Sequence, residues 1–234
     1  MLAPRARRRE KDMSIWQRWL HHPESFWARK ALFQIHLWAG VVVGLYLVLM
    51  SISGSVIVFR NNLERTSPVA VIEWLVDFHA NLLSGVVGRF VNGIGSVCLI
   101  SLCLTGAIIW WPGLSGWRRA LTVNWRSRFS RFVWDGHSAV GIWGFFFLLM
   151  WGISGFYFAF PEIVNAIFRF FDPAGKVMDQ ALDWLSMVHF GRFGWFAEML
   201  WAFAGLTLAF LSVSGVFLCC HRMIYKSSPK EIPR

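Results

Sequence analysis

The sequence predicts an all-α integral membrane protein with four membrane-spanning helices, and three observations lead to this prediction. Of the 234 residues, 56% are hydrophobic and 15% are charged, whereas an average soluble domain has about 25% charged residues. Four long stretches contain no Asp, Glu, Lys or Arg, and the basic residues concentrate between alternate stretches. Ordinary soluble domains and disordered chains do not combine these features.

Each charge-free stretch is at least as long as the roughly 20 apolar residues that cross a bilayer. In chain order the stretches are Ala31–Phe59, Phe90–Trp117, Gly136–Pro161 and Met199–Cys220. They divide the chain into a basic N-terminal segment (1–30), a first transmembrane hairpin (31–117), a basic loop (118–135), a second transmembrane hairpin (136–220) and a tail (221–234). A buried helix of a soluble protein rarely stays uncharged for so long, so we expect four spans.

The distribution of Lys and Arg predicts the orientation of these spans. Residues 1–30 contain eight, residues 118–135 five and residues 221–234 four, whereas residues 60–89 and 162–198 contain three each. Because positive charge gathers in cytoplasmic segments, both termini and the middle loop are expected in the cytoplasm. The same bias accounts for the net charge of +10. The expected partner is therefore the lipid bilayer, and no nucleic acid is expected.

An internal repeat organises the four spans. Four dipeptides of Ser or Thr followed by Gly stand near the ends of the spans: Ser53-Gly54, Thr105-Gly106, Ser154-Gly155 and Ser214-Gly215. From His36 and from His137 the next dipeptide follows after 17 residues in both cases. From His79 it follows after 26 residues, and from His189 after 25 residues. The repeat predicts a pseudo-symmetric four-helix bundle built from two copies of one helical hairpin.

The second and fourth helices are longer than a membrane requires. From His79 to Trp111 is 32 residues, which would make about 48 Å of continuous helix. The hydrocarbon core is only about 30 Å thick. We therefore expect both helices to project from the membrane, to tilt strongly, or to break at Gly85 and Gly88 and at Gly191 and Gly194.

Pseudo-symmetry predicts two facing pairs of histidines, His36 with His137 near the cytoplasmic surface and His79 with His189 near the opposite one. Two neutral imidazoles from opposite helices can hold one haem iron axially. Ionisable side chains inside spans are costly, which makes them functional candidates. We expect one or two haem b groups per chain, with these four histidines as iron ligands and His221 in reserve. Structural or proton-handling roles for the histidines stay open.

Glycines follow both histidines of the cytoplasmic pair at spacings that place them on the same helix face: Gly40 and Gly44, and Gly141 and Gly144. A strip without side chains lets a flat macrocycle lie against the backbone, so these glycines are predicted to border the haem. Small residues at this spacing also pack helix against helix in membranes, and this alternative stays open. The hydroxyls of the four dipeptides are expected to bond back to the preceding turn or to cross-link helices.

Four segments with this order of His, Gly and Ser/Thr-Gly resemble the PepSY-associated transmembrane family: WARKALFQIHLWAGVVVGLYLVLMSISGSVIVF, HANLLSGVVGRFVNGIGSVCLISLCLTGAIIWWPG, FVWDGHSAVGIWGFFFLLMWGISGFYF and HFGRFGWFAEMLWAFAGLTLAFLSVSGVFLCCHR. The resemblance covers nearly all of residues 27–222. It implies a multi-pass protein of the bacterial inner membrane. Some members are ferric-siderophore reductases that bind b-type haem, which implies haem ligation by the four paired histidines. Typical members carry a periplasmic PepSY domain between the first two helices, and Arg60–Phe78 leaves no room for one.

The expected function is electron transfer across the membrane to a periplasmic ferric iron, ferric chelate or partner protein, as in a ferric-siderophore reductase. No Gly-rich dinucleotide fingerprint precedes a helix in the cytoplasmic segments. A cytoplasmic protein or a membrane quinol is therefore the expected electron donor. Two alternatives stay open: a haem-free scaffold or accessory subunit of a transporter, and a quinone-linked cytochrome b anchor of a partner enzyme. A homo-oligomer is also compatible with the sequence.

Overall fold

A computed structural model describes residues 13–64, 68–172 and 175–227, and within these ranges the chain is helical and forms no strand. Three helices are long and apolar enough to cross a membrane: α3 (Trp27–Ile57), α6 (Gly85–Trp110) and α12 (Trp195–Ser227). A fourth span results if α8 (Phe129–Trp143) and α9 (Phe145–Ala159), which meet at an angle of 62°, are taken together. The chain is therefore an all-helical membrane protein with three or four candidate spans.

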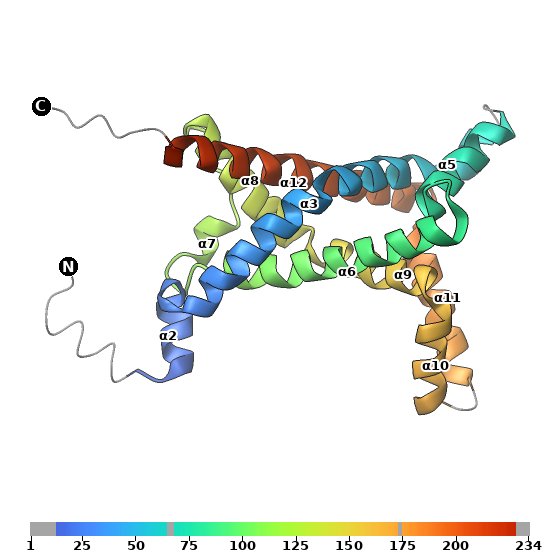
Figure 1. Cartoon of the computed structure of the whole chain (residues 1–234), viewed down its shortest axis with the longest axis horizontal. Coiled ribbons are helices and arrows are strands. Elements are labelled where there is room, and N and C mark those ends of the chain that lie inside the picture. Colours follow the sequence, from blue (N-terminus) through green and yellow to red (C-terminus); the bar gives the residue numbers. More distant parts are fainter. Residues whose placement is uncertain (1–12, 65–67, 173–174, 228–234) are drawn as a thin grey trace, which may run out of the picture.

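The remaining helices gather at the two ends of the molecule (Figure 1). One end holds α2 (Ile15–His21), the 3-10 turn η1 (Pro23–Ser25), α7 (Trp117–Ala120) and the C-terminal part of α12. The opposite end holds α4 (Arg60–Leu63), α5 (Val69–Asn81), α10 (Pro161–Phe171) and α11 (Lys176–Phe190). In Figure 1, α2, α10 and α11 run across the direction of the long helices.

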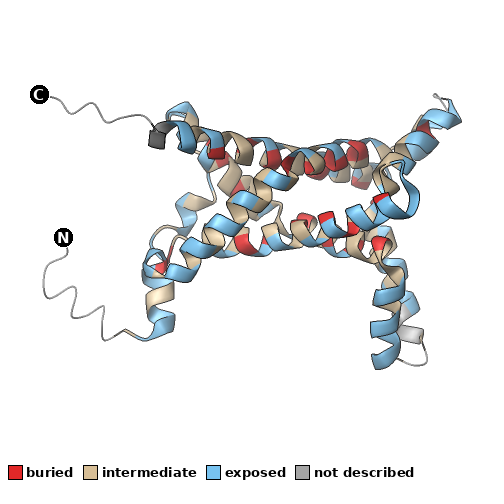
Figure 2. Cartoon of the chain, viewed as in Figure 1, coloured by how far each residue is buried: buried red, intermediate tan, exposed pale blue. Residues whose placement is uncertain are grey.

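The long helices pack side by side in the order α6, α3, α12 and α8, and α9 packs on α6. Within the predicted hairpins α3 packs on α6 and α8 on α12, and between the hairpins α3 packs on α12 and α6 on α9. Figure 2 shows buried residues along the inner sides of these helices, where Leu47, Leu99, Cys103 and Leu148 form the core. Only 17% to 28% of the most apolar stretch of each of the three long spans is buried. The outer surface is therefore apolar, as contact with lipid requires.

Small polar residues bring α3 and α12 together. The Ser51 hydroxyl donates to the carbonyl of Gly205 at 2.5 Å and accepts from the backbone N–H of Ala209 at 3.0 Å. The Ser55 hydroxyl donates to the carbonyl of Ala202 at 3.1 Å. A side chain at Gly205 would collide with Ser55, so the two backbones approach each other only because this residue is glycine.

Both of the over-long helices break, which is one of the three arrangements that the sequence allowed. In the first hairpin α5 ends at Asn81 and α6 begins at Gly85, with Leu82 and Leu83 at φ of 51° and 57°. In the second hairpin α11 ends at Phe190, and Gly191 closes it at φ 65° in the left-handed conformation. Such a residue is the usual end of a helix, because its N–H bonds back to a carbonyl of the last turn.

Two boundaries differ from the predicted spans. The charge-free stretch runs to Trp117, but α6 ends at Trp110 because Trp111, with ψ 109°, takes the extended conformation that Pro112 imposes on its predecessor. The predicted third span, Gly136–Pro161, is divided at Gly144 between α8 and α9. Glycine is a common position for a sharp helix bend.

The junction between α5 and α6 makes a stability prediction. A Cβ atom at Gly88 would overlap the backbone carbonyl of Asn81, and a helix end gives way less easily than a side chain. Gly88→Ala is expected to lower the free energy of unfolding by about 2 kcal/mol or more, seen as a lower thermal midpoint in detergent. At Gly40 the nearest atom would lie at 3.8 Å, so Gly40→Ala is the control. Equal midpoints for the two variants would contradict this role of Gly88.

Candidate cofactor site: two pairs of histidines

The first pair of histidines meets between α3 and α8. The ring centres of His36 and His137 lie 6.4 Å apart with an angle of 87° between the ring planes. An imidazole nitrogen binds a first-row metal at about 2.0–2.1 Å and lies about 1.1 Å from its ring centre, so two rings on opposite sides of one metal have centres about 6.3 Å apart. The observed separation is close to the one that two imidazoles holding a single metal ion between them would have.

The second pair, His79 and His189, lies at the opposite end of the molecule on α5 and α11, outside the long apolar helices. Burial lowers the pKa of His79 to about 4, against the opposing effect of a hydrogen bond to the carbonyl of Met50. Burial and the charge of His79 lower the pKa of His189 to about 3. Both rings are therefore neutral at pH 7, and the neutral imidazole is the form that binds a metal.

Every one of the four histidines has a hydroxyl beside its Nδ1 atom. The Nδ1–oxygen distances are 3.0 Å for His36–Thr105, 2.9 Å for His79–Ser53, 2.8 Å for His137–Ser214 and 2.6 Å for His189–Ser154. In each case the hydroxyl comes from the other half of the same predicted hairpin. The sequence predicted that these hydroxyls bond back to their own turn or cross-link helices, but not that histidine is the partner. The sequence feature that could have indicated this pairing is the interval of 17 residues from His36 to Ser53, which is the same from His137 to Ser154.

The glycine that follows three of these hydroxyls leaves space for the histidine ring. A Cβ atom at Gly54, Gly106 or Gly215 would lie 2.9, 3.1 or 3.3 Å from the Cε1 atom of His79, His36 or His137, respectively. The fourth glycine, Gly155, instead faces Ser96, whose hydroxyl oxygen would lie 2.7 Å from a Cβ atom there. In three of the four dipeptides, the hydroxyl thus contacts the Nδ1 atom of the histidine, and the absence of a side chain at the glycine leaves space for the adjacent Cε1 atom.

The glycines predicted to border a macrocycle contact neighbouring helices. The Cβ position of Gly40 faces Leu102 of α6 at 3.8 Å, and those of Gly44 and Gly141 face Val216 and Leu211 of α12 at 3.1 and 3.7 Å. Gly144 lies at the bend, with the Thr207 hydroxyl 3.5 Å from its Cβ position. These contacts are the ones that helix packing alone would give, and a role beside a macrocycle stays a prediction. The reserve ligand His221 lies on α12, 5.9 Å from Phe217 between ring centres.

Side chains hold the backbone at the two helix breaks. The Asn92 amide donates to the carbonyl of His79 at 2.8 Å and accepts from the Tyr46 hydroxyl at 3.1 Å. In the second hairpin the Trp151 indole donates to the carbonyl of His189 at 3.2 Å. A helix end has carbonyls without partners in the helix, and these contacts satisfy them while fixing the position of each histidine.

The fold and this site define a membrane protein in which apolar helices carry histidines held by buried hydroxyls. The chain belongs to the family described as the PepSY-associated TM region, whose profile matches residues 33–68, 66–175 and 166–222. The predicted family is therefore confirmed. An uncharacterised protein of Pseudomonas aeruginosa is 33% identical over 87 residues, which cover 36% of this chain and 21% of that protein. The match thus spans about a fifth of that relative. No solved structure matches the chain.

The lowered pKa values of His79 and His189 predict acid sensitivity in the haem-free protein. An unfolded histidine titrates near pH 6.5, so between that pH and about 4 the unfolded state binds more protons than the folded state does. Stability is full above pH 6.5 and falls as the pH drops, by about 1.4 kcal/mol per pH unit for each histidine. Thermal midpoints measured from pH 7.5 to 4.5 test this. The variant His79→Gln with His189→Gln is expected to lose most of the slope, and an unchanged slope would refute the assignment.

Proposed function

We propose that this chain is a b-type cytochrome of the bacterial inner membrane that passes electrons from the cytoplasmic side to a periplasmic ferric iron or ferric chelate such as a ferric siderophore. The observation that carries the proposal is the 6.4 Å separation of His36 and His137. Haem iron supplies reversible one-electron transfer when two imidazoles hold it. The protein residues would set the ligand geometry, exclude water and keep the rings neutral.

The proposal includes a topology. Joined at Gly144, α8 and α9 make a fourth span, and the four spans form two hairpins related by pseudo-symmetry. The pattern of helix packing supports this, because the packing of α3 on α6 and on α12 corresponds to the packing of α8 on α12 and of α9 on α6 in the other repeat. Both termini and the 118–135 loop would lie in the cytoplasm, where the excess of Lys and Arg belongs. His36 and His137 are then the pair nearer the cytoplasm, and His79 and His189 are nearer the periplasm.

Haem quantification per chain, with a reduced-minus-oxidised visible spectrum of detergent-purified protein, tests this function. Two b-type haems are expected, one lost in His36→Ala and the other in His79→Ala, because each variant removes one axial ligand. His21→Ala is the control, since His21 is an exposed residue of α2. One haem, lost only in His36→Ala, would confine the site to the cytoplasmic pair. Folded protein without haem after growth with a haem supply would overturn the proposal and favour a haem-free scaffold or transporter subunit.

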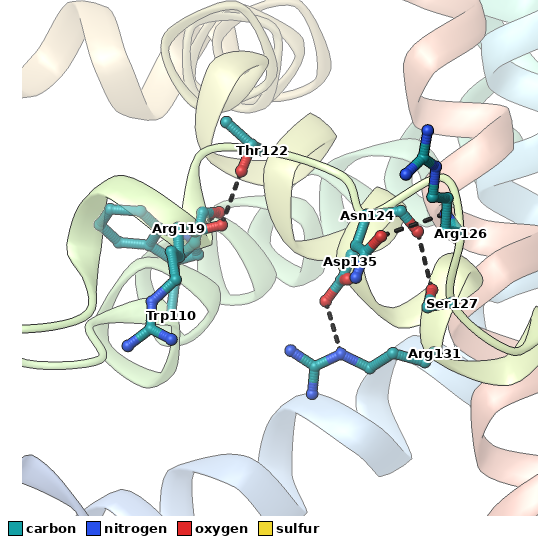
Figure 3. Close-up of polar contacts among 9 residues, drawn as sticks. Trp110, Arg119, Thr122, Asn124, Arg126, Ser127, Arg131 and Asp135 are labelled. Atoms are coloured by element: carbon teal, nitrogen blue, oxygen red, sulfur yellow. Dashed lines mark hydrogen bonds and ion pairs between the residues drawn. The ribbon is translucent and has the colours of Figure 1, made fainter.

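A second candidate, a cytochrome that takes its electrons from a membrane quinol, is favoured by a pocket between α6, α7 and α8. The pocket has a volume of about 270 Å³, and its lining includes Trp110 and Trp134 as aromatic walls. Arg131 and Asp135 also line it and are joined by an ion pair of 2.9 Å (Figure 3). Asp135 lies two residues before His137 on α8. An aromatic headgroup in this pocket would thus have a carboxylate as proton acceptor on the same helix as His137.

Oxidation of a quinol to a quinone releases two electrons, which the proposed haem would take one at a time, and two protons, which Asp135 would accept in turn and release to the cytoplasmic water. Asp135→Asn is expected to slow reduction of the bound haem by a soluble quinol about tenfold or more, while reduction by dithionite stays unchanged. Asp183→Asn, on exposed α11 at the opposite end, is the matched control. Equal quinol rates in the two variants would exclude the pocket as the donor site and leave a cytoplasmic protein as donor.

A further inference from the structure

The hydroxyl beside each histidine already gives its own proton to the backbone. Each donates to a carbonyl of the preceding turn: Ser53 to Leu49 at 2.8 Å, Thr105 to Ser101 at 2.6 Å, Ser154 to Met150 at 2.7 Å and Ser214 to Leu211 at 3.2 Å. A hydroxyl has one proton to donate and two lone pairs to accept with. Toward the histidine, therefore, each oxygen acts as an acceptor.

An acceptor beside Nδ1 selects the tautomer of the ring. The Nδ1 atom must carry the proton to make the bond, and in a neutral imidazole the Nε2 atom then keeps its lone pair. We infer that Ser53, Thr105, Ser154 and Ser214 are positioning residues that hold the four histidines with Nδ1 protonated and Nε2 free to bind a metal. This inference rests on the proposed function for its purpose, but the tautomer itself is a property of the chain without a cofactor.

The glycine after the hydroxyl fixes the orientation of the ring as well as its proton. In three of the four dipeptides the Cε1 edge of the ring lies against the backbone of the glycine. A ring turned by 180° about its Cβ–Cγ bond would place the carbon atom Cδ2 at the hydroxyl and the Nε2 atom at the glycine, so the hydrogen bond to the hydroxyl would be lost. Contacts at the two adjacent ring atoms Nδ1 and Cε1 therefore fix which way round the ring sits, and the hydroxyl bonds to Nδ1 and not to Nε2.

A partner on the second nitrogen of a metal-bound histidine orients the ligand and raises its basicity, and its removal typically costs 10- to 100-fold in metal affinity. The four hydroxyls are equivalent in the two repeats, and three are Ser whereas one is Thr. The two hydroxyl types should therefore replace each other at these positions. This interchange separates a hydrogen-bonding role from simple packing, because Ala resembles Ser in size but has no hydroxyl.

The first experiment uses haem-free protein labelled with ¹⁵N-histidine in detergent at pH 7.5. The ¹⁵N shifts are expected to show four rings with a protonated Nδ1 atom. Ser53→Ala should move one ring, His79, to a mixture of tautomers or to the Nε2-protonated form. Ser51→Ala is the matched control, because the Ser51 hydroxyl is equally buried in α3 but bonds to Gly205 of α12. Protonated Nε2 atoms in the wild type, or no change in Ser53→Ala, would overturn the inference.

The second experiment titrates haem into the apoprotein and measures affinity and midpoint potential. Thr105→Ala is expected to weaken binding at the cytoplasmic pair about tenfold or more and to shift its potential, whereas Thr105→Ser restores both. Ser51→Ala should leave both unchanged. Equal affinity and potential in Thr105→Ala and wild type would refute the positioning role. Protein that shows the expected tautomers but binds no haem would instead refute the proposed function while leaving the tautomer assignment intact.

Discussion

The hydrogen bond between an imidazole and a hydroxyl of the neighbouring helix is the constraint on which the rest of this structure depends. A polar ring surrounded by apolar helices needs a partner, and without water that partner must come from the protein. In the first hairpin His36 of α3 bonds to Thr105, and Ser53 of α3 bonds to His79. These contacts are 17 residues apart on α3, or about 26 Å along the helix. In each hairpin, therefore, one such hydrogen bond joins the two halves near each end. The two bonds together fix the register of one helix against the other.

The helix breaks follow from the same constraint. A continuous helix from His79 to Trp111 would exceed the hydrocarbon thickness and would place its first turn beyond the end of α3. With Leu82 in the left-handed conformation, the chain turns between α5 and α6, and His79 lies beside Ser53 instead. The second hairpin reaches the same contact, His189 with Ser154, through a turn at Gly191. Two different turns that deliver the same hydrogen bond indicate that the bond, and not the turn, is what the two repeats share.

The order of the motifs was sufficient to predict the family, and composition was sufficient to predict the helical class and the approximate positions of the long helices, because the bilayer imposes an apolar composition on every stretch separately. The partners of the histidines could not be predicted in the same way. Thr105 is 69 residues from His36 in the sequence. The spacing of the motifs shows which residues are equivalent in the two repeats, but it does not show which residues touch each other within one repeat. The bend at Gly144 was also missed, since glycines occur inside many straight membrane helices and the sequence does not mark which of them bends.

In the proposed function an electron crosses the membrane, and the chemistry of the spans supports this over the transport of an ion. The four charge-free stretches contain no Asp, Glu, Lys or Arg, and transporters that couple to ions rely on such groups or on unwound backbone within the membrane. The polar rings that the stretches do contain, His36 and His137, have Nδ1 bound to a hydroxyl that is itself bound to the backbone. Such a chain of bonds ends at a carbonyl and offers a proton no onward route. The nitrogen that remains would be free to hold the haem iron of the proposed function, which would accept and give up an electron without moving any atom of the protein across the bilayer.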